Sequence, residues 1–390
     1  MSNGSVTAAG NKAVQTNPQG PGNVVIAGAG IMGCATAYYL SKLGVAATVV
    51  EKGEVACASS GKAGGFLALD WSDGGPVGPL ARLSYSLHKT LASELGQDTG
   101  YREVRTFSVA ASAKPGGRKA NTGKNGPQWL DGNVQKIKEM AEEGTTAQVH
   151  PQKLTAAFMG AAQAAGAKLV RGSIQGIAID KKSNSVTGVN VDGETIPADK
   201  VIIAMGPWSG EAAKWVPSAP IISGQKAHSI LVRPTEPVGP DCLFTQFQNS
   251  SGRHTDPEVY PRPDGTVYIC GESDSVSLPD DPMSIQPRAS AMKSLQEVGA
   301  AISSALSQGK VEAEQACYLP VSGDSTPVIG KLPGVEGCYM ASGHSCWGIL
   351  NGPATGKVMA ELVANGKATS LDISAFDPAR FSKTRRGIFC

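Results

Sequence analysis

The stretch that decides the fold is NVVIAGAGIMGCATAYYL at residues 23–40, where an apolar run, a glycine-rich turn and a second apolar run follow one another. Residues 23–27 are rich in β-branched side chains and predict a strand. Residues 34–43 predict a helix that ends at Gly44. The order of strand, glycine turn and helix is typical of the first unit of a dinucleotide-binding fold.

The glycines of this turn have the spacing Gly-x-Gly-x-x-Gly, and each has a physical role. Gly28 allows the tight turn, Gly30 lets backbone N–H groups approach a pyrophosphate, and Gly33 lets the helix pack closely on the strand. A second β-branched run at 45–50 ends in Glu51, whose carboxylate can accept hydrogen bonds from ribose hydroxyls. We therefore predict an α/β fold with a Rossmann-type domain that binds an adenine dinucleotide.

The residues after this unit distinguish between possible dinucleotides. Glu51 disfavours NADP, whose extra phosphate would meet a carboxylate, although Lys52 beside it can still reach a phosphate. The sequence ASSGKAGGF at 58–66 is a second run of small residues, which lets the backbone lie close to an extended ligand. Because FAD is longer than NAD and needs a second cradle for its diphosphate and ring, this run favours FAD.

The composition is that of an ordinary folded chain. Of the 390 residues, 41% are hydrophobic and 17% are charged, and the formal net charge of +2 provides no basic field for nucleic acid. Glycine is in excess, with 48 residues, which indicates many places where the backbone approaches a ligand. No apolar run approaches 18 residues, so we expect no transmembrane segment.

Neither the cysteines nor the chain ends indicate export. The eight cysteines form no Cys-x-x-Cys pair and no metal-ligand spacing, so we expect reduced thiols and no metal site. Residues 1–22 are polar, without the apolar core of a signal peptide, and predict a disordered leader. The last residues form no peroxisomal signal. We therefore expect a cytoplasmic protein.

Later segments indicate that the nucleotide domain is interrupted by insertions. We expect helices at 80–96, 148–166, 289–306 and 354–364. We expect strands at 103–111, 167–171, 173–180, 186–191, 195–196, 201–204, 229–232, 258–260, 266–270 and 338–341. The strand at 201–204 would return beside the first strand, 114–132 would form an exposed loop, and the glycine-rich loop at 343–353 would lead into the last helix.

These segments predict two domains. The dinucleotide-binding domain would comprise 23–70, 148–215 and 317–370, the substrate domain with a mixed sheet would comprise 71–147 and 216–316, and 371–390 would form a tail.

Together these motifs resemble the FAD-dependent oxidoreductases that include D-amino-acid oxidase, glycine oxidase and sarcosine oxidase. The resemblance runs from residue 23 to about 366, and its stretches at 61–71 and 343–356 look most like a plant and fungal branch of the family. Its carriers are GAGIMG with Glu51, the cradle at 59–67, VHPQKL at 149–154, ADKVIIAMGPWS at 198–209, YPRPDG at 260–265 and the block from GDSTPVIG to GHSCWGILNGPATG.

The resemblance implies which residues would hold FAD. On the dinucleotide side these are Gly28, Ala29, Gly30, Ile31, Met32, Gly33, Glu51, Lys52, Ile174, Ala204, Gly206 and Trp208. For the diphosphate and ring they are Ser59, Ser60, Lys62, Ala63, Gly64, Gly65 and Phe66. The loop with Gly343, Gly348, Ile349 and Leu350 would face the pyrimidine carbonyl with its backbone N–H groups.

The resemblance also singles out one cysteine. In the sarcosine-oxidase and fructosyl-amine-oxidase branches, a cysteine seven residues before an aspartate is joined to the flavin through sulfur. Cys317 has this relation to Asp324. Two interpretations of Cys317 therefore stay open, a covalent flavin attachment and the ordinary burial of a small apolar thiol.

The substrate residues depart from the family pattern. Amino-acid oxidases hold the substrate carboxylate with an arginine, whose position matches Leu319. Glycine oxidase has a second arginine where this chain has Cys346, and sarcosine oxidase has a lysine where it has Leu350. The lysine that activates dioxygen in sarcosine oxidase falls at Tyr268. These differences argue against simple amino acids as substrates and against fast reaction with dioxygen.

Aromatic residues remain near the expected ring position. His344 is the best titratable candidate, because an imidazole changes charge near neutral pH. The candidate catalytic residues are His344, Tyr268 and Trp347, and the candidate substrate contacts are Trp71, Tyr260 and His228. Lys226, His228, Arg82 and Arg262 are possible replacement contacts for an anion. For each residue taken singly, core packing is the alternative.

The expected function is the oxidation of a C–N bond of an amine or amino-acid-like substrate to an imine, by hydride transfer to FAD. Dioxygen or another acceptor would reoxidise the flavin. Two alternatives stay open: a flavoprotein of reduced activity that acts as a scaffold or trafficking factor, and an NAD-dependent dehydrogenase. We expect a small-molecule partner and a monomer or homodimer.

Overall fold

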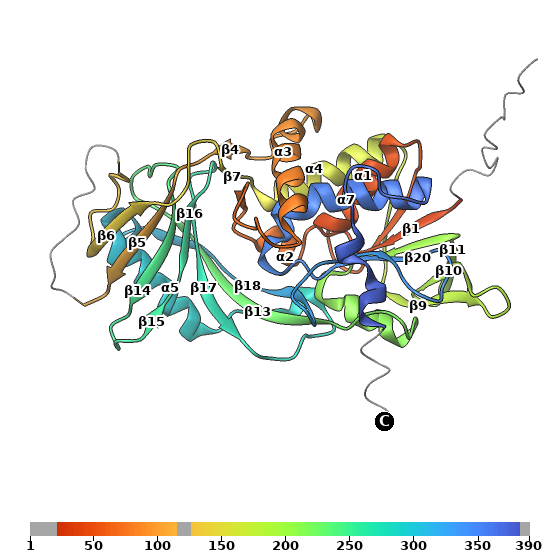
Figure 1. Cartoon of the computed structure of the whole chain (residues 1–390). Coiled ribbons are helices and arrows are strands. Elements are labelled where there is room, and N and C mark those ends of the chain that lie inside the picture. Colours follow the sequence, from red (N-terminus) through yellow and green to blue (C-terminus); the bar gives the residue numbers. More distant parts are fainter. Residues whose placement is uncertain (1–21, 115–125, 383–390) are drawn as a thin grey trace, which may run out of the picture.

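A computed structural model describes residues 22–114 and 126–382. The predictions for 1–21, 115–125 and 383–390 lie outside the described residues. They concern nearly all of the predicted leader, the centre of the predicted loop at 114–132 and the end of the predicted tail. Figure 1 shows two parts beside each other. One contains the N-terminal strand with several helices, and the other contains a large curved sheet.

Within the described residues, the first part is built on a sheet of six strands in the order β19-β20-β12-β1-β2-β8. The strands are β1 (Val24–Ala27), β2 (Thr48–Glu51), β8 (Lys168–Arg171), β12 (Lys200–Ile203), β19 (Val328–Lys331) and β20 (Cys338–Ser342). β1 is parallel to β12 and β2, and Val25 pairs with Val201 and Thr48. Because β1 is buried on both faces, its sequence is continuously apolar. The predicted Rossmann-type α/β fold is confirmed.

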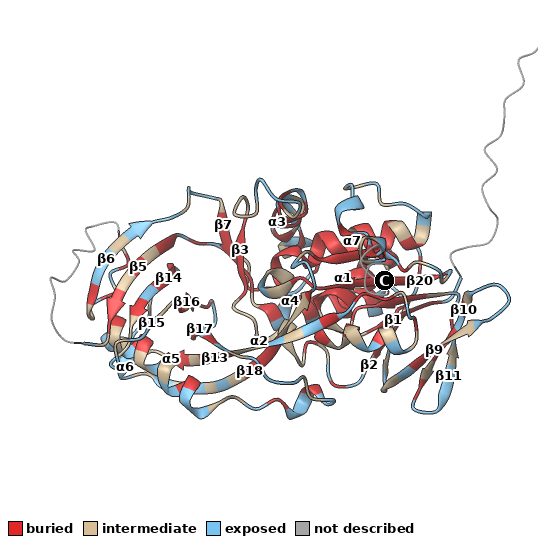
Figure 2. Ribbon diagram, turned by 60° about the horizontal axis from the view of Figure 1, so that its bottom comes forward, coloured by how far each residue is buried: buried red, intermediate tan, exposed pale blue. Residues whose placement is uncertain are grey.

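Four helices share one apolar core with this sheet. They are α1 (Ile31–Lys42), α3 (Gly78–Glu94), α4 (Pro151–Ala164) and α7 (Gly348–Asn365). Figure 2 colours most of α1 and α7 as buried. The helix predicted at 354–364 is longer and begins at Gly348, so that Pro353 lies inside it. Helix α3 belongs to the segment expected in the substrate domain, yet Leu80 and Leu91 pack into this core.

Two small antiparallel sheets flank the first. The strands predicted between residues 167 and 196 are present, and three of them form one sheet: β9 (Ile174–Asp180), β10 (Ser185–Val191) and β11 (Glu194–Pro197). The other sheet contains β3 (Phe66–Ala68), β4 (Arg102–Glu103) and β7 (Thr146–Gln148). Short helical turns are α2 (Ser59–Lys62), η1 (Gly206–Lys214), η2 (Pro282–Ser284), η3 (Ser345–Trp347), η4 (Ser374–Phe376) and η5 (Pro378–Phe381).

The second part is an eight-stranded sheet in the described residues, with the order β18-β13-β17-β16-β14-β5-β6 and β15 beside β14. The strands are β5 (Thr106–Ser112), β6 (Val134–Glu139), β13 (Ile222–Arg233), β14 (Cys242–Gln248), β15 (His254–Thr255), β16 (Glu258–Pro261), β17 (Val267–Asp274) and β18 (Lys310–Ser322). Helix α5 (Ala289–Ile302) packs on it, followed by α6 (Ser304–Ser307).

The longest strand pair in the described residues lies within the large sheet. β13 and β18 pair from Ile222 with Ser322 to Arg233 with Lys310. The sequence analysis did not predict β18, because 310–316 alternates charged residues with small ones and gives little hydrophobic signal. The predicted domain boundary at residue 317 falls inside this strand. The division into domains stays a prediction.

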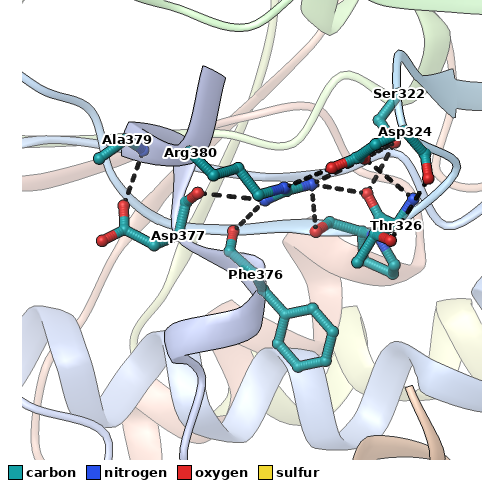
Figure 3. Close-up of polar contacts among 8 residues, drawn as sticks. Ser322, Asp324, Thr326, Phe376, Asp377, Ala379 and Arg380 are labelled. Carbon is teal, nitrogen blue, oxygen red and sulfur yellow. Dashed lines mark hydrogen bonds and ion pairs between the residues drawn. The ribbon is translucent and has the colours of Figure 1, made fainter. Parts of the chain in front are cut away.

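The end of the described chain is tied down by two polar networks. Arg380 donates from Nε to Asp324 Oδ2 at 2.7 Å and from Nη2 to the carbonyl oxygen of Thr326 at 2.9 Å, as Figure 3 shows. The hydrogen bond from Arg380 is the main reason why the pKa of Asp324 is lowered. This network fastens η5 to the turn between β18 and β19.

The second network centres on Glu361 near the end of α7. The side chain is 8% exposed and accepts from the N–H groups of Thr369 at 2.7 Å and Ser370 at 2.8 Å, and from the Ser370 hydroxyl. Burial by itself would raise the pKa of Glu361, but these hydrogen bonds outweigh it and lower the pKa to about 2. The carboxylate therefore holds the chain that follows α7 against the helix.

Candidate functional site

A cavity of about 670 Å³ is lined by residues from both large sheets. The residues singled out from the sequence that line it are Gly28, Gly30, Ile31, Met32, Glu51, Lys52, Ser59, Ser60, Ala63, Gly64, Gly65, Phe66, Ile174, Ala204, Gly206, Trp208, His228, Tyr260, Tyr268, Cys317, His344, Trp347, Gly348 and Ile349. Those that do not line it are Ala29, Gly33, Lys62, Trp71, Gly343 and Leu350.

The glycine turn forms one end of the cavity. Gly28 has a φ of +102°, and a Cβ atom there would lie 2.6 Å from the carbonyl oxygen of Ala204. A Cβ atom on Gly33 would lie 1.9 Å from the carbonyl oxygen of Gly28, which explains why Gly33 belongs to the packing and not to the cavity surface. Both glycines are therefore required by the close approach of α1, β1 and β12.

Glu51 does more than the sequence analysis expected. Its Oε2 atom accepts from the Ala29 N–H at 2.7 Å, and its Oε1 atom accepts from the Gly53 N–H at 2.8 Å. These bonds fix the glycine turn against the end of β2, and they explain why Ala29 contributes its backbone to the turn instead of lining the cavity. Glu51 itself lines the cavity, where an oxygen lone pair stays available to a ribose hydroxyl.

The second cradle, at α2, links the glycine turn to β18. The Ser60 hydroxyl accepts from the Ile31 N–H at 2.9 Å, and the Ser59 hydroxyl donates to the Tyr318 carbonyl at 2.6 Å. Lys62 donates to the Ala316 carbonyl at 3.1 Å, so its ammonium contacts β18 and does not line the cavity. The small residues at 63–65 then run along the cavity wall.

The first turn of α7 also faces the cavity, through Gly348 and Ile349. Pro353 has no N–H group, so the carbonyl of Ile349 loses its usual helical donor. His88 of α3 compensates, because its Nε2 atom lies 3.1 Å from the Ile349 carbonyl oxygen and 3.0 Å from that of Leu350. The Ser84 hydroxyl accepts from the Ala354 N–H at 3.0 Å.

His88 is neutral in this position. Burial lowers its pKa to about 4, although hydrogen bonds to the two carbonyl groups act in the opposite direction. An Nε2–H group can donate to those carbonyls in the neutral ring. Leu350 is buried beside this contact instead of lining the cavity, and Gly343, with a φ of +81°, forms the turn before the loop. α3 therefore sets the position of the first turn of α7.

These features fit an extended dinucleotide such as FAD. Two helices, α1 and α7, present their first turns to the cavity, and free N–H groups at helix N-termini favour anions. Two runs of small residues allow close approach of a ligand, and at Gly206 a Cβ atom would meet nothing within 4 Å.

Aromatic rings form the other end of the cavity. Tyr260 stacks on Phe66 at 5.4 Å between ring centroids and on Tyr268 at 6.1 Å. Phe244 lies 5.8 Å from Tyr260, and both line the cavity with Trp347. Trp71 packs behind this surface, 5.1 Å from Phe66, which is why it does not line the cavity. The rings come from four separate segments of the chain.

Glu258 lies among these rings, and the sequence analysis did not single it out. Its Oε2 atom accepts from the Tyr260 hydroxyl at 2.7 Å and from the Cys270 thiol at 3.5 Å. Burial raises the pKa of Glu258. The signal that would have found it is its spacing of two from Tyr260 in the predicted strand at 258–260, which puts both side chains on one face.

Two of the predicted catalytic residues, His344 and Tyr268, are titratable, and burial shifts the pKa of each. His344 lines the cavity, its Nε2 atom lies 3.0 Å from the Thr355 hydroxyl, and burial lowers its pKa to about 3, so the ring is neutral at physiological pH. Its Nδ1 atom has no hydrogen-bond partner among the described residues. Burial raises the pKa of Tyr268 far above its ordinary value. Neither residue is a general acid in this state.

Of the proposed anion contacts, only His228 lines the cavity. Its Nε2 atom lies 2.7 Å from Asp274 Oδ2, so this nitrogen is already engaged. Arg262 donates from Nη2 to the Ala63 carbonyl at 2.6 Å and lies 5.0 Å from the Tyr268 ring centroid. Arg82 pairs with Asp73 at the surface. Lys226 is on β13 outside the cavity lining.

Cys317 lines the cavity near Ser59 and Lys62. Burial raises the pKa of its thiol to about 11, while the Lys62 charge and a hydrogen bond with Ser59 act in the lowering direction. The covalent link stays a prediction. The seven cysteines in the described residues are all unpaired, and Cys390 lies outside them.

Comparison with known proteins agrees with this geometry. A family model described as FAD dependent oxidoreductase matches residues 23–362. A putative oxidoreductase of Schizosaccharomyces pombe is 30% identical, over 91% of this chain and 97% of its own. A glycine oxidase of Pseudomonas aeruginosa is 27% identical, over 91% and 98%. The crystal structure of glycine oxidase from Geobacillus kaustophilus has a TM-score of 0.79 at 24% identity, covering 93% and 99%.

Proposed function

Because the chain belongs to the family of FAD-dependent oxidoreductases, we propose that it oxidises a C–N bond of an amine or amino-acid-like substrate to an imine. The observation that supports this most is the continuity of the cavity, which runs from the dinucleotide cradle at Gly28 and Glu51 to the aromatic wall around Tyr260. The family uses FAD, so the predicted cofactor is confirmed and the NAD-dependent alternative is set aside.

Bound FAD supplies a two-electron acceptor for hydride. The substrate carbon next to nitrogen loses hydride, and the nitrogen lone pair becomes the second bond of the C=N group, which gives an iminium ion. Loss of an N–H proton to water then gives the imine. The reaction therefore requires a neutral amine at that nitrogen. The stacked rings of Phe66, Tyr260 and Tyr268 exclude water from the reacting carbon and offer a flat surface for orienting it.

The neighbouring side chains assist little with proton transfer. The buried, neutral His344 can orient a substrate N–H group through an imidazole nitrogen, but its lowered pKa makes it a poor proton donor. Tyr268, in the position where sarcosine oxidase has its lysine, carries no cation for activating dioxygen. We therefore propose that an acceptor other than dioxygen contributes to reoxidation of the flavin, and that reoxidation by dioxygen is slow.

The test is anaerobic reduction of the bound flavin by a panel of amines and amino acids, followed by absorbance. The proposal predicts loss of the flavin absorbance band with at least one amine, and its return on adding air or an electron acceptor such as a quinone. If no compound bleaches the flavin, the proposal fails and the scaffold function that the missing arginine at Leu319 suggests is favoured.

Other expectations about the protein stay predictions. In the described residues no helix is long and apolar enough to cross a bilayer. The cytoplasmic location and the monomeric or homodimeric state are parts of the proposal, and subcellular imaging and light scattering would test them. Of the matched relatives, one is named a putative oxidoreductase and another a glycine oxidase, and these names support a small-molecule substrate.

A further inference from the structure

The carboxylate of Glu258 lies among the aromatic rings of the cavity, and no cation accompanies it there. Among the described residues, no lysine, arginine or histidine nitrogen lies within ion-pair distance of it. By contrast, Glu272 of β17 pairs with Arg253 at 3.4 Å and Arg288 at 3.5 Å. Only Oε2 of Glu258 is engaged, by the Tyr260 hydroxyl and the Cys270 thiol. Its Oε1 atom has no hydrogen bond within the described ranges.

The cavity as a whole is poor in positive charge. The acidic residues that line it are Glu51, Glu211, Glu258, Glu272 and Asp280. Among the described residues, Lys52 is the one lysine or arginine in the lining, and its Nζ atom donates to the Asp280 carbonyl near the dinucleotide end. In the described residues, the lining of the aromatic end therefore has a negative group and no lysine or arginine, and the nearest guanidinium, that of Arg262, lies behind the Tyr268 ring, outside the lining. A substrate carboxylate would meet repulsion there.

The walls around Glu258 are suited to a cation. Phe244 and Trp347 line the same cavity, and faces of such rings attract ammonium groups, whereas the Tyr260 ring already stacks on Phe66 and Tyr268. Cys346, beside Trp347, is close enough that the Glu258 charge contributes to raising its pKa, after burial as the larger cause. A carboxylate and several rings around one space form the arrangement that recognises an alkylammonium ion.

Burial raises the pKa of Glu258, and an ammonium ion beside it acts in the lowering direction. In such an ion pair the nitrogen keeps its proton, because an aliphatic amine has a pKa of about 10 in water. The nitrogen next to the carbon that loses hydride must be neutral. The nitrogen bound at Glu258 and the nitrogen that is oxidised are therefore different atoms. A substrate that satisfies both requirements has two amino groups.

We propose that Glu258 and the rings of Phe244 and Trp347 bind the distal ammonium group of an aliphatic diamine or polyamine that carries no carboxylate. This inference rests on the proposed amine oxidation, and it names the substrate class. Glu258 is then a specificity-determining residue. Leu319 and Cys346, which replace family arginines and line the same cavity, leave this end without a carboxylate clamp.

Three probes that differ by one group test the inference: 1,5-diaminopentane, 1-aminopentane, which lacks the second amine, and lysine, which adds a carboxylate. The FAD-loaded protein is titrated with each, and binding is measured from the change in flavin absorbance and from the shift in thermal unfolding. The diamine should bind about tenfold or more tightly than either of the other two, as expected for a charge-assisted contact. Equal binding of the diamine and 1-aminopentane, or tighter binding of lysine, would overturn the inference.

Glu258→Gln should weaken binding of the diamine by about tenfold and remove its preference over lysine, because the shape is kept and the charge is lost. Glu143→Gln, at an exposed position outside the cavity, is the matched control and should bind all three probes as the wild type does. If Glu258→Gln keeps the full preference, Glu258 is not the recognition group. Should that variant fail to hold FAD, Glu258→Asp keeps the charge and must retain part of the preference.

The two proposals fail in different ways. If the diamine binds but no amine reduces the flavin, the oxidation proposal falls and the binding inference stands. If 1-aminopentane or an amino acid reduces the flavin without any preference for the diamine, the oxidation proposal stands and the inference about Glu258 falls.

Discussion

Substituting Gly64 with alanine adds one methyl group at the point where the cofactor cradle meets the aromatic wall. The Cβ atom would lie 2.6 Å from Cδ2 and 2.7 Å from Cε2 of Tyr260, and 3.0 Å from Cε1 of Tyr268. The Tyr260 ring cannot retreat freely, because it stacks on Phe66 and its hydroxyl is bonded to Glu258. Gly64 does not have a positive φ, so the cost is steric and not a matter of backbone strain.

Overpacking of this kind costs about 1–3 kcal/mol in a packed interior. Relief requires that the rings move or that the cradle moves into the cavity, and both line the space that FAD would occupy. If the cost falls on the FAD-bound state, it corresponds to binding that is about 5- to 140-fold weaker, at 1.4 kcal/mol per tenfold.

The assay is titration of the flavin-free protein with FAD, together with the ratio of FAD to polypeptide after purification. Gly75→Ala is the control, because Gly75 is exposed, has no positive φ, and its Cβ atom would come no closer than 3.5 Å to another atom. Gly75→Ala should match the wild type. An unchanged FAD affinity in Gly64→Ala would refute the argument that the cradle and the aromatic wall are in close contact.

Three further predictions concern stability and the flavin. Glu361→Gln should lower the free energy of unfolding, measured in urea, by about 1–3 kcal/mol at pH 7. This difference should disappear as the pH falls from 4.5 towards 2, because the lowered pKa of Glu361 stabilises the fold only while the carboxylate is ionised. The exposed Glu143→Gln is the control, and a difference that does not change with pH would contradict the reasoning. His88→Ala should cost about 2–4 kcal/mol in thermal or urea unfolding and weaken FAD binding, because it leaves two buried carbonyl groups beside Pro353 without donors; normal FAD affinity would argue against its role in positioning α7. Acid denaturation should leave yellow colour on the wild-type polypeptide but not on Cys317→Ser, and free flavin from the wild type would end the covalent hypothesis.

The dinucleotide end of the site could be predicted from the sequence because its determinants are local. The glycine turn, the strand before it and the helix after it lie within 23–43, and Glu51 follows the next strand. Glycine spacing and apolar runs record such local geometry directly. The same holds for the return of β12 beside β1, since the apolar run at 201–203 is typical of a buried strand in the middle of a parallel sheet.

Elements that depend on their neighbours escaped prediction. β18 is held by its long pairing with β13, and its own residues alternate without a strong apolar face. α7 begins at Gly348 because two side chains of α3 replace hydrogen bonds that Pro353 disturbs: His88 contacts the Ile349 carbonyl, and the Ser84 hydroxyl accepts from the Ala354 N–H. Nothing in the sequence of residues 348–353 predicts these contacts. His88 looks like one more residue of an amphipathic helix until α7 packs against it.

The sequence alone determined the fold, the dinucleotide and the segments that approach it, because these follow from backbone freedom and hydrophobic periodicity within short stretches. The tertiary structure decided the character of the substrate end, where Phe66, Glu258, Tyr268 and Trp347 meet from segments far apart in the chain. Whether a carboxylate is paired or alone depends on which charges the fold brings within a few ångströms of it. For Glu258 that answer comes only from the packing of the large sheet against the cofactor cradle.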